Sequence, residues 1–250
     1  MVNLNLRPLS LAGLIAAAAA PTALAQEQAV AWSPSYVGTC TPCELSGRNL
    51  TGWTLTGANY AEARMDRAVL RDVNAVSVNF EGADLTGADL RRAVFTDARL
   101  AGVKLTGARM MGFSAVGADL TGAAIYGANL EGAILIGANL RDAHLMTALL
   151  GGADLSSANL EGAFFDRADL RGAVLNAANL RGARLPGANI AGASFKDARF
   201  PGADLQGVIG FEEADFEGAC GSLTTRLPAG LRLPRCTRAQ LAAGVVISAD

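Results

Sequence analysis

The chain has 250 residues, a normal length for one domain, with 21 Lys and Arg against 23 Asp and Glu. Its formal net charge is −2, and the acidic and basic residues are interspersed. This composition argues against non-specific binding to nucleic acid or to an anionic membrane surface, because both require a concentrated basic patch.

Residues 1–25 have the features of a secretory signal peptide. Arg7 gives a short positive region, an apolar run extends from Leu9 to Ala20, and Ala23-Leu24-Ala25 is a small-residue cleavage site. The apolar run is too short to span a membrane well. We therefore predict cleavage after Ala25, a periplasmic or secreted location and no membrane insertion, with residues 26–42 as an N-terminal cap segment.

From Leu45 to Leu205, every fifth residue is the centre of a repeating unit, and there are 33 such centres. All but Ala75 and Ala115 are Leu, Ile, Met, Phe or Tyr. Ala stands two residues before the centre in 26 units, and Gly stands two residues after it in 21. Residues five apart point in different directions on a helix and to opposite faces of a strand. The chain must therefore turn once per unit and wind around an axis as a solenoid.

Tandem copies of Ala-(Asp/Asn)-Leu-X-Gly resemble the pentapeptide-repeat family, and clear examples are 118–122, 128–132, 168–172 and 178–182. The resemblance covers residues 43–218. It implies an all-β fold, a right-handed quadrilateral β-helix with four units per coil and with the centre and Ala side chains inside. The 33 units then give about eight coils and a rod about 40 Å long at a strand spacing of about 4.8 Å.

The four cysteines are Cys40, Cys43, Cys220 and Cys236. An even number together with an export signal favours disulfides. On a rod of this length the first two lie at one end and the last two at the other. Because a disulfide needs Cα atoms within about 7 Å, we predict the pairs Cys40–Cys43 and Cys220–Cys236. A thioredoxin-like redox centre or a zinc site at Cys40–Cys43 remains an alternative, although no βαβ pattern surrounds the motif.

An open solenoid end exposes apolar side chains and unpaired backbone, so we predict a cap at each end. Trp32, Tyr36 and Trp53 are candidates to cover the first coil. The repeat stops after Gly218, and residues 219–250 are predicted to form the C-terminal cap, with a short helix from Arg238 to Ala243.

Residues 20 apart should stack on one face of such a rod. Along one face this spacing predicts a polar column of Asn59, Asn79, Arg99, Asp119, Asn139, Asn159, Asn179 and Arg199. We interpret this column as an amide ladder that satisfies the turns. Beside it, the charges of Arg141, Glu161 and Arg181 should attract one another from coil to coil.

A second face stacks β-branched side chains. Its candidate partner patch consists of Val94, Val116, Ile134, Ile136 and Val174. Exposed apolar patches mark contact sites for other proteins. The alternative is that Val and Ile are present because they suit β-structure.

The sequence shows no catalytic constellation. The single histidine, His144, has no Ser or Cys partner, and the recurring Gly residues serve turns instead of opening a helix at a phosphate. We therefore predict that the protein is not an enzyme and has no cofactor or metal.

The favoured function is an exported, non-enzymatic scaffold of the bacterial envelope that binds an unidentified protein, as a monomer or an end-to-end dimer. One alternative is a thiol-redox or assembly factor acting through Cys40 and Cys43. Another is a DNA mimic that binds DNA gyrase, as some members of the pentapeptide-repeat family, which the chain resembles, do. The signal peptide and the mixed surface charge disfavour that role.

Overall fold

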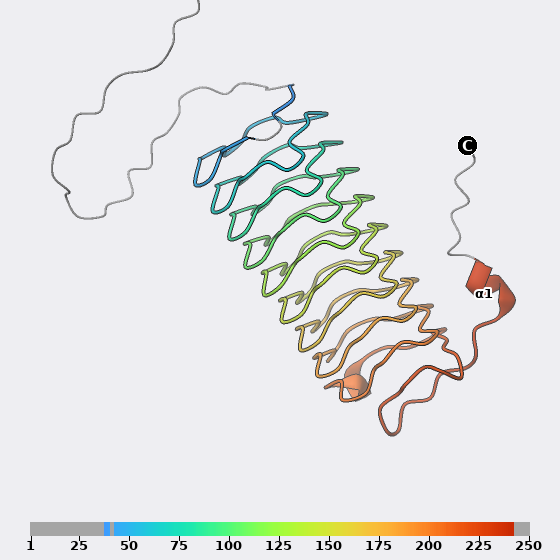
Figure 1. The fold of residues 1–250 in the computed structure, drawn as a ribbon. Helices are drawn as coiled ribbons and strands as arrows, with labels where there is room; N and C mark the ends of the chain where they lie inside the picture. The colour runs from blue at the N-terminus through green and yellow to red at the C-terminus, as the bar shows by residue number, and fades with distance from the viewer. Residues whose placement is uncertain (1–37, 41–42, 243–250) are drawn as a thin grey trace, which may run out of the picture.

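The computed structural model describes residues 38–40 and 43–242, which wind into a rod of stacked coils (Figure 1). The predicted signal peptide, most of the predicted segment 26–42, and the side chains of Trp32 and Tyr36 lie outside the described residues. Two short helices occur near the C-terminal end, the 3-10 helix η1 at Phe211–Glu213 and the α-helix α1 at Arg238–Ala242.

Parallel β-bridges join each coil to the next, and most of them link residues 20 apart in the sequence. Thr39 pairs with Asn59, and Asn59 pairs with Asn79, so the bridges run in columns along the rod. The backbone hydrogen bonds alternate in direction: Leu55 N–H donates to Asn74 O at 2.7 Å, and Asn74 N–H donates back to Trp53 O at 2.9 Å. Four five-residue units therefore make one coil, and the predicted stacking of residues 20 apart is confirmed.

Each unit ends in a tight turn with a left-handed residue. At all 33 positions two residues after a centre, φ is positive, between 54° and 74°. The carbonyl of the centre accepts the N–H three residues later, as Ala58 N–H donates to Leu55 O at 3.0 Å. Glycine takes this conformation without strain. At the other 12 positions the closed coil imposes it on Asp, Arg, Ser, Glu, Thr or Ala.

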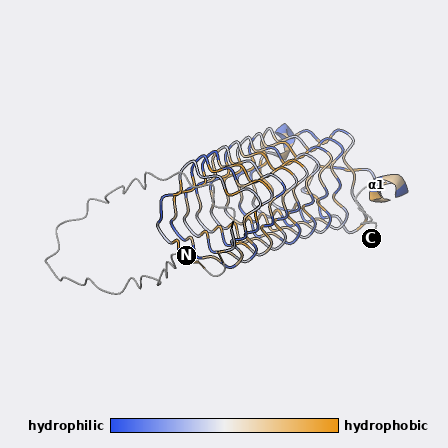
Figure 2. Ribbon diagram, turned by 90° about the horizontal axis from the view of Figure 1, so that it is seen from above, coloured by the Kyte–Doolittle hydropathy of each residue, from blue (hydrophilic) through white to orange (hydrophobic). Residues whose placement is uncertain are grey.

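The core is a narrow column formed by the centres and the small residues two places before them. Hydrophobic and hydrophilic residues alternate along each coil (Figure 2). A reversal of the large-and-small pattern is also accommodated, because Phe113 and Ala115 are both buried. The ring of Phe113 lies against that of Phe95, with 5.2 Å between centroids, and so fills the space beside the small centre.

The predicted amide ladder is confirmed for the part of the polar column from Asp119 to Asn179. Asn159 Nδ2 donates to Asn139 Oδ1 at 3.0 Å, and Asn179 Nδ2 donates to Asn159 Oδ1 at 3.1 Å. Asn139 Nδ2 continues the chain to Asp119 Oδ1 at 3.1 Å. Each of these oxygens also accepts the backbone N–H two residues later, as Asn159 Oδ1 does from Glu161 at 3.3 Å. The amides thus hold their own turns and join neighbouring coils.

The predicted charge row beside the ladder is correct only in part. Arg181 and Glu161 approach to 3.8 Å. Arg141 instead pairs with Asp142 at 3.4 Å, because that carboxylate is next to it in the same turn.

Asp89 is the most buried charged residue of the described chain, with 9% of its surface exposed. Arg91 binds both of its oxygens, Nε to Oδ1 at 2.8 Å and Nη2 to Oδ2 at 2.6 Å. Burial acts to raise the pKa of Asp89, but hydrogen bonds from the side chain and backbone N–H of Arg91 outweigh it and lower this pKa below its usual value. The carboxylate is therefore held ionised inside a fork of the guanidinium.

The register changes near the C-terminal end. Ser194 bridges to Asp215, 21 residues on, and Asp204 bridges to Arg226, 22 residues on. Gly210 takes the place of a large centre with φ of 76°, and η1 follows it. Farther along, Leu227 and Leu233 pack partly buried against the core. The helix predicted at Arg238 is present as α1.

Glycine at the turns should stabilise the fold because it adopts a positive φ without strain. A Cβ at Gly132 would meet no atom within 4 Å, so Gly132→Ala should lower the free energy of unfolding by about 1–2 kcal/mol through left-handed strain alone. At Gly210 a Cβ would come within 2.5 Å of Ala191 Cβ, so Gly210→Ala should cost more. Urea denaturation of both variants checks this, and equal losses would contradict the distinction.

Acid should weaken the fold through Asp89. Because its pKa is lowered in the folded state, its stabilising contribution is complete above the ordinary aspartate pKa of about 3.9 and is lost as the pH falls through the native value. Asp89→Asn should therefore be less stable than the wild type at neutral pH, and the difference should shrink in acid. Urea midpoints at about pH 7 and pH 3 measure it, and a difference independent of pH would refute the assignment.

Candidate functional site

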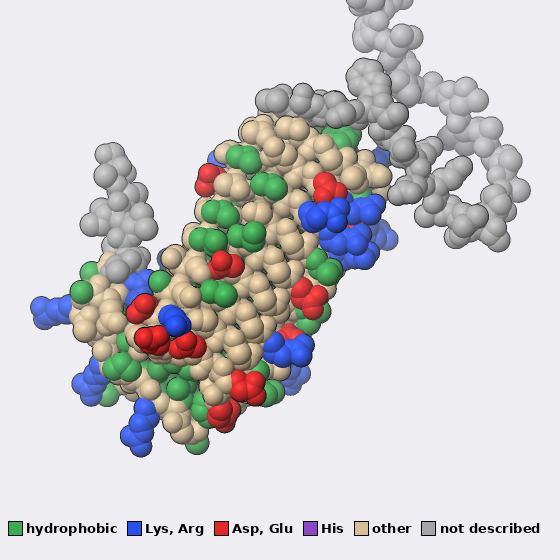
Figure 3. Space-filling model, turned by 180° about the vertical axis from the view of Figure 1, so that it is seen from behind, with side chains coloured by type: hydrophobic (Ala, Val, Ile, Leu, Met, Phe, Trp, Pro, Cys, Tyr) green, Lys and Arg blue, Asp and Glu red, His purple; other side chains and the backbone are tan. Residues whose placement is uncertain are grey.

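One face of the rod combines apolar side chains with few charges (Figure 3). We call it the neutral face, and it consists of two parallel rows. Its bridge row is Thr54, Asn74, Val94, Ser114, Ile134, Asp154, Val174, Ser194 and Asp215. Its turn row is Thr56, Val76, Thr96, Val116, Ile136, Ser156, Asn176, Lys196 and Glu217, in which the carbonyls of Val76 and its successors accept N–H bonds from the preceding coil.

The structure places all five residues of the candidate partner patch on the neutral face, in two rows. Val94, Ile134 and Ile136 are 38%, 41% and 39% exposed, whereas Val116 and Val174 are half-buried. From Thr54 to Ile136 the two rows hold no charged side chain. The tightly bonded coils fix the backbone beneath these side chains, so the patch is preformed.

Three of the four charged residues on the neutral face gather at its C-terminal end. Lys196 Nζ lies 3.2 Å from Asp215 Oδ2 and 3.1 Å from Glu217 Oε2. Hydrogen bonds to Glu217 and Asp215 raise the pKa of Lys196. The Glu217 backbone N–H, followed by the bond to Lys196, lowers the pKa of Asp215. This cluster is internally paired, and the remaining charged residue of the two rows is Asp154, one coil after Ile134 in the bridge row.

A different face carries an aromatic stack around the single histidine. The ring of His144 lies parallel to Tyr126 at 5.3 Å and to Phe164 at 4.9 Å, centroid to centroid. The guanidinium of Arg184 covers the far side of Phe164 at 5.7 Å. Sequence reasoning missed this contact, although the 20-residue spacing of His144, Phe164 and Arg184 is the signal that finds it. The stack joins neighbouring coils on this face.

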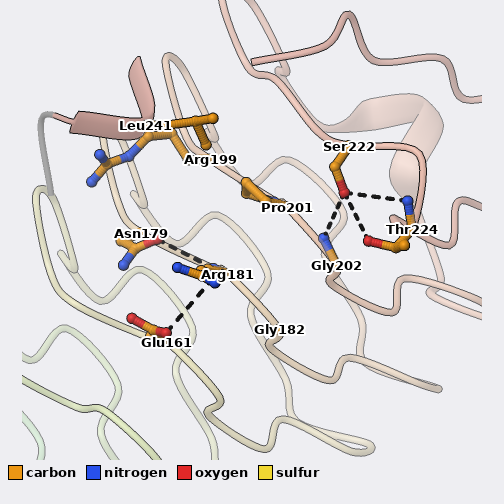
Figure 4. Close-up of a pocket in the computed structure, with 10 residues that line it drawn as sticks. All are labelled: Glu161, Asn179, Arg181, Gly182, Arg199, Pro201, Gly202, Ser222, Thr224 and Leu241. Carbon is orange, nitrogen blue, oxygen red and sulfur yellow. Dashed lines mark hydrogen bonds and ion pairs between the residues drawn. The ribbon is translucent and has the colours of Figure 1, made fainter. Parts of the chain in front are cut away.

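A groove of about 570 Å³ lies between the polar column and α1 (Figure 4). Arg199 Nη1 donates to Gln240 O at 2.8 Å, and Arg181 faces Glu161. Ser222 Oγ accepts the Gly202 N–H at 3.0 Å. These polar groups are therefore already bound within the chain. Sequence reasoning did not predict this groove, because the segment that closes it lies outside the repeat.

The cysteines stand at disulfide distance in the two expected pairs. The Cα atoms of Cys40 and Cys43 are 5.3 Å apart, and those of Cys220 and Cys236 are 4.8 Å apart. Cys43 and Cys220 are buried, and Cys40 packs partly buried against the core. Their surroundings resemble those of structural cysteines, which are inert because they are screened from solvent.

In the part of the chain that the structure describes, no group of three or more His, Cys, Asp and Glu side chains is arranged to hold a metal ion. Within the same residues, no helix has the length and apolar character needed to cross a membrane.

Comparisons with known proteins identify relatives of this repeat. The family model for pentapeptide repeats matches in eight copies, over residues 49–87, 76–112, 116–152, 148–185 and 173–209. No curated protein sequence matches the chain.

Among solved structures, HetL from the cyanobacterium Nostoc sp. strain PCC 7120, a protein involved in the regulation of heterocyst differentiation, is 33% identical with a TM-score of 0.55; the match covers 75% of this chain and 88% of HetL. The pentapeptide-repeat protein alr5209 of Nostoc PCC 7120 is 30% identical over 58% of this chain and 77% of its own, with a TM-score of 0.21. QnrB1, a plasmid-mediated fluoroquinolone resistance protein, is 17% identical over 73% of this chain and 92% of its own, with a TM-score of 0.32.

The five-residue period, the 20-residue coil and the buried centres thus agree with the family match and with HetL, and the chain belongs to the pentapeptide-repeat family.

Proposed function

We propose that the protein is an exported, non-enzymatic scaffold whose neutral face binds another protein. The observation that carries this proposal is the exposure of Val94, Ile134 and Ile136 on a rigid surface that lacks charge along more than half of its length. Such a surface loses little conformational entropy on binding, because its backbone is already fixed. Desolvating the uncharged part of the face, from Thr54 to Ile136, also removes no ionic hydration shell.

A comparison with exposed apolar residues elsewhere supports the choice of face. Leu149 is 39% exposed, as much as Ile136, but its column also holds Asp89, Arg109 and Asp169. Burying that column against a partner would desolvate charged groups at a cost. The neutral face has no such cost from Thr54 to Ile136, and between Ile136 and Lys196 its two rows hold one charged residue, Asp154.

The proposal extends to the whole rod and its location. The rod is a right-handed β-helix of about eight coils, and it is capped at both ends. Cleavage after Ala25 then releases the chain into the periplasm or the medium, where the two cysteine pairs are oxidised. The apolar N-terminal run and its cleavage site support export, and the packing of Trp53, Leu227 and Leu233 against the core supports closure of the ends.

Neither alternative function gains support from the surface. Arg and Lys form pairs with Asp and Glu across the coils, as Arg92 does with Asp72 at 2.7 Å and Arg226 with Asp204 at 3.3 Å. A DNA mimic needs a surface with uncompensated negative charge. The burial of Cys43 likewise favours a structural link over thiol exchange.

Cross-linking in the native envelope fraction tests the binding face. The wild type should capture a specific protein, and Ile134→Glu combined with Ile136→Glu should lose it, because two carboxylates would be buried without partners. Leu149→Glu is the matched control, with equal exposure on another face, and it should retain capture. Capture that survives in the double variant, or that is lost in the control alone, would remove the neutral face from the proposal.

Thiol trapping under native conditions tests the role of the cysteines. Both pairs should be oxidised and unreactive, and Cys220→Ser with Cys236→Ser should lower the free energy of unfolding by about 2–4 kcal/mol. A reversible change in the labelling of Cys40 and Cys43 between reducing and oxidising media, with binding unaffected, would instead support the redox role.

A further inference from the structure

We infer that the occupant of the neutral face is a second copy of this chain, packed side by side and antiparallel. This inference rests on the proposed function of that face and identifies its partner. The starting observation is symmetry in the bridge row, where Val94 and Val174 stand two coils before and two coils after Ile134. The middle of the row is therefore its most exposed apolar residue, and the flanking apolar residues are equidistant from it.

A two-fold axis through Ile134, perpendicular to the rod and in the plane of the interface, uses this symmetry. It brings Ile134 against Ile134 of the second copy, and Val94 against the second copy's Val174. The same axis brings Ser114 against Asp154, and Thr54 against Asp215. Apolar side chains thus meet apolar ones, and each carboxylate meets a hydroxyl that can donate a hydrogen bond to it.

The same two-fold axis brings the turn rows of the two copies together. Because this axis keeps each edge of the face against the same edge of the second copy, Ile136 meets Ile136, and Val116 meets Ser156. Lys196 meets Val76 one coil before the end of the row, where its aliphatic stem can cover the valine while its ammonium stays paired with Asp215 and Glu217. No charged residue of either row faces a like charge.

Charge selects this orientation over the parallel one. With a two-fold axis that runs along the bridge row, Asp154 would face Asp154 and Asp215 would face Asp215. Like charges across an interface disfavour that pairing. The parallel arrangement would also move the turn row to the opposite edge and separate Ile136 from its equivalent.

The contact is a narrow strip along one side of a rod, so the surface area that it buries lies at the low end of the range for specific protein interfaces. The dimer should therefore dissociate on dilution. It differs from an end-to-end dimer because the terminal coils take no part.

Sedimentation over a range of protein concentrations tests the self-association. The wild type and Leu149→Glu should dimerise, whereas Ile134→Glu and Ile134→Lys should each weaken the dimer by about tenfold or more. An equimolar mixture of the two Ile134 variants should recover dimers, because opposite charges then meet on the axis. Recovery also shows that the variants are folded.

Disulfide cross-linking between introduced cysteines tests the antiparallel orientation of the two copies. All four native cysteines are paired, so the wild type supplies the thiol-free control. Val94→Cys mixed with Val174→Cys should form covalent dimers, and neither variant should do so alone. Covalent dimers of Val94→Cys alone would show the parallel arrangement and overturn the inference.

Two results separate this inference from the proposed function. A wild type that remains monomeric at every concentration, while its envelope capture is lost in the Ile134→Glu, Ile136→Glu variant, would overturn self-pairing and leave the scaffold function standing. Dimers that persist undiminished in both Ile134 variants would place the contact elsewhere, such as at the ends, and would also overturn it.

Discussion

The structure depends on one backbone requirement, a left-handed residue two places after every centre. That residue turns the chain once per unit, so that each large side chain points to the same axis and each small one fits beside it. Glycine meets the requirement at most positions, and at Ala177, where φ is 58°, an ordinary side chain accepts it. Such exceptions show that the stacked coils, and not local preference alone, determine the conformation. Hydrogen bonds to both neighbouring coils supply the constraint.

The inside of the rod was predictable because the period is visible along the sequence. A spacing of five identified the centres, and a spacing of 20 identified the columns, including the Asn139–Asn179 ladder. The contact partners of long side chains were less predictable, because they depend on distances of a few ångströms. Arg141 turned to its neighbour Asp142 instead of to Glu161, and His144 stacked between two rings. Beyond Gly218 no period remains, so the groove beneath α1 follows only from tertiary packing.

A five-residue repeat leaves few positions for function. The centre, the residue two places before it and the left-handed turn residue are all committed to the fold. The bridge residue and the first turn residue remain, and every fourth unit adds one of each to a given face. The side chains that share a face therefore recur at intervals of 20 residues. They are polar amides on one column, and uncharged and β-branched residues on the neutral face. The symmetry of Val94, Ile134 and Val174 is visible only at that interval.

Hydroxyl-radical footprinting of the protein in its native location would test the central claim, that the neutral face is the working surface. Val94, Ile134 and Ile136 should be protected relative to the purified, dilute protein, while Leu149 and Met111, which are exposed to a similar degree on another face, should react equally in both. Full reactivity of the neutral face in its native location would contradict the account.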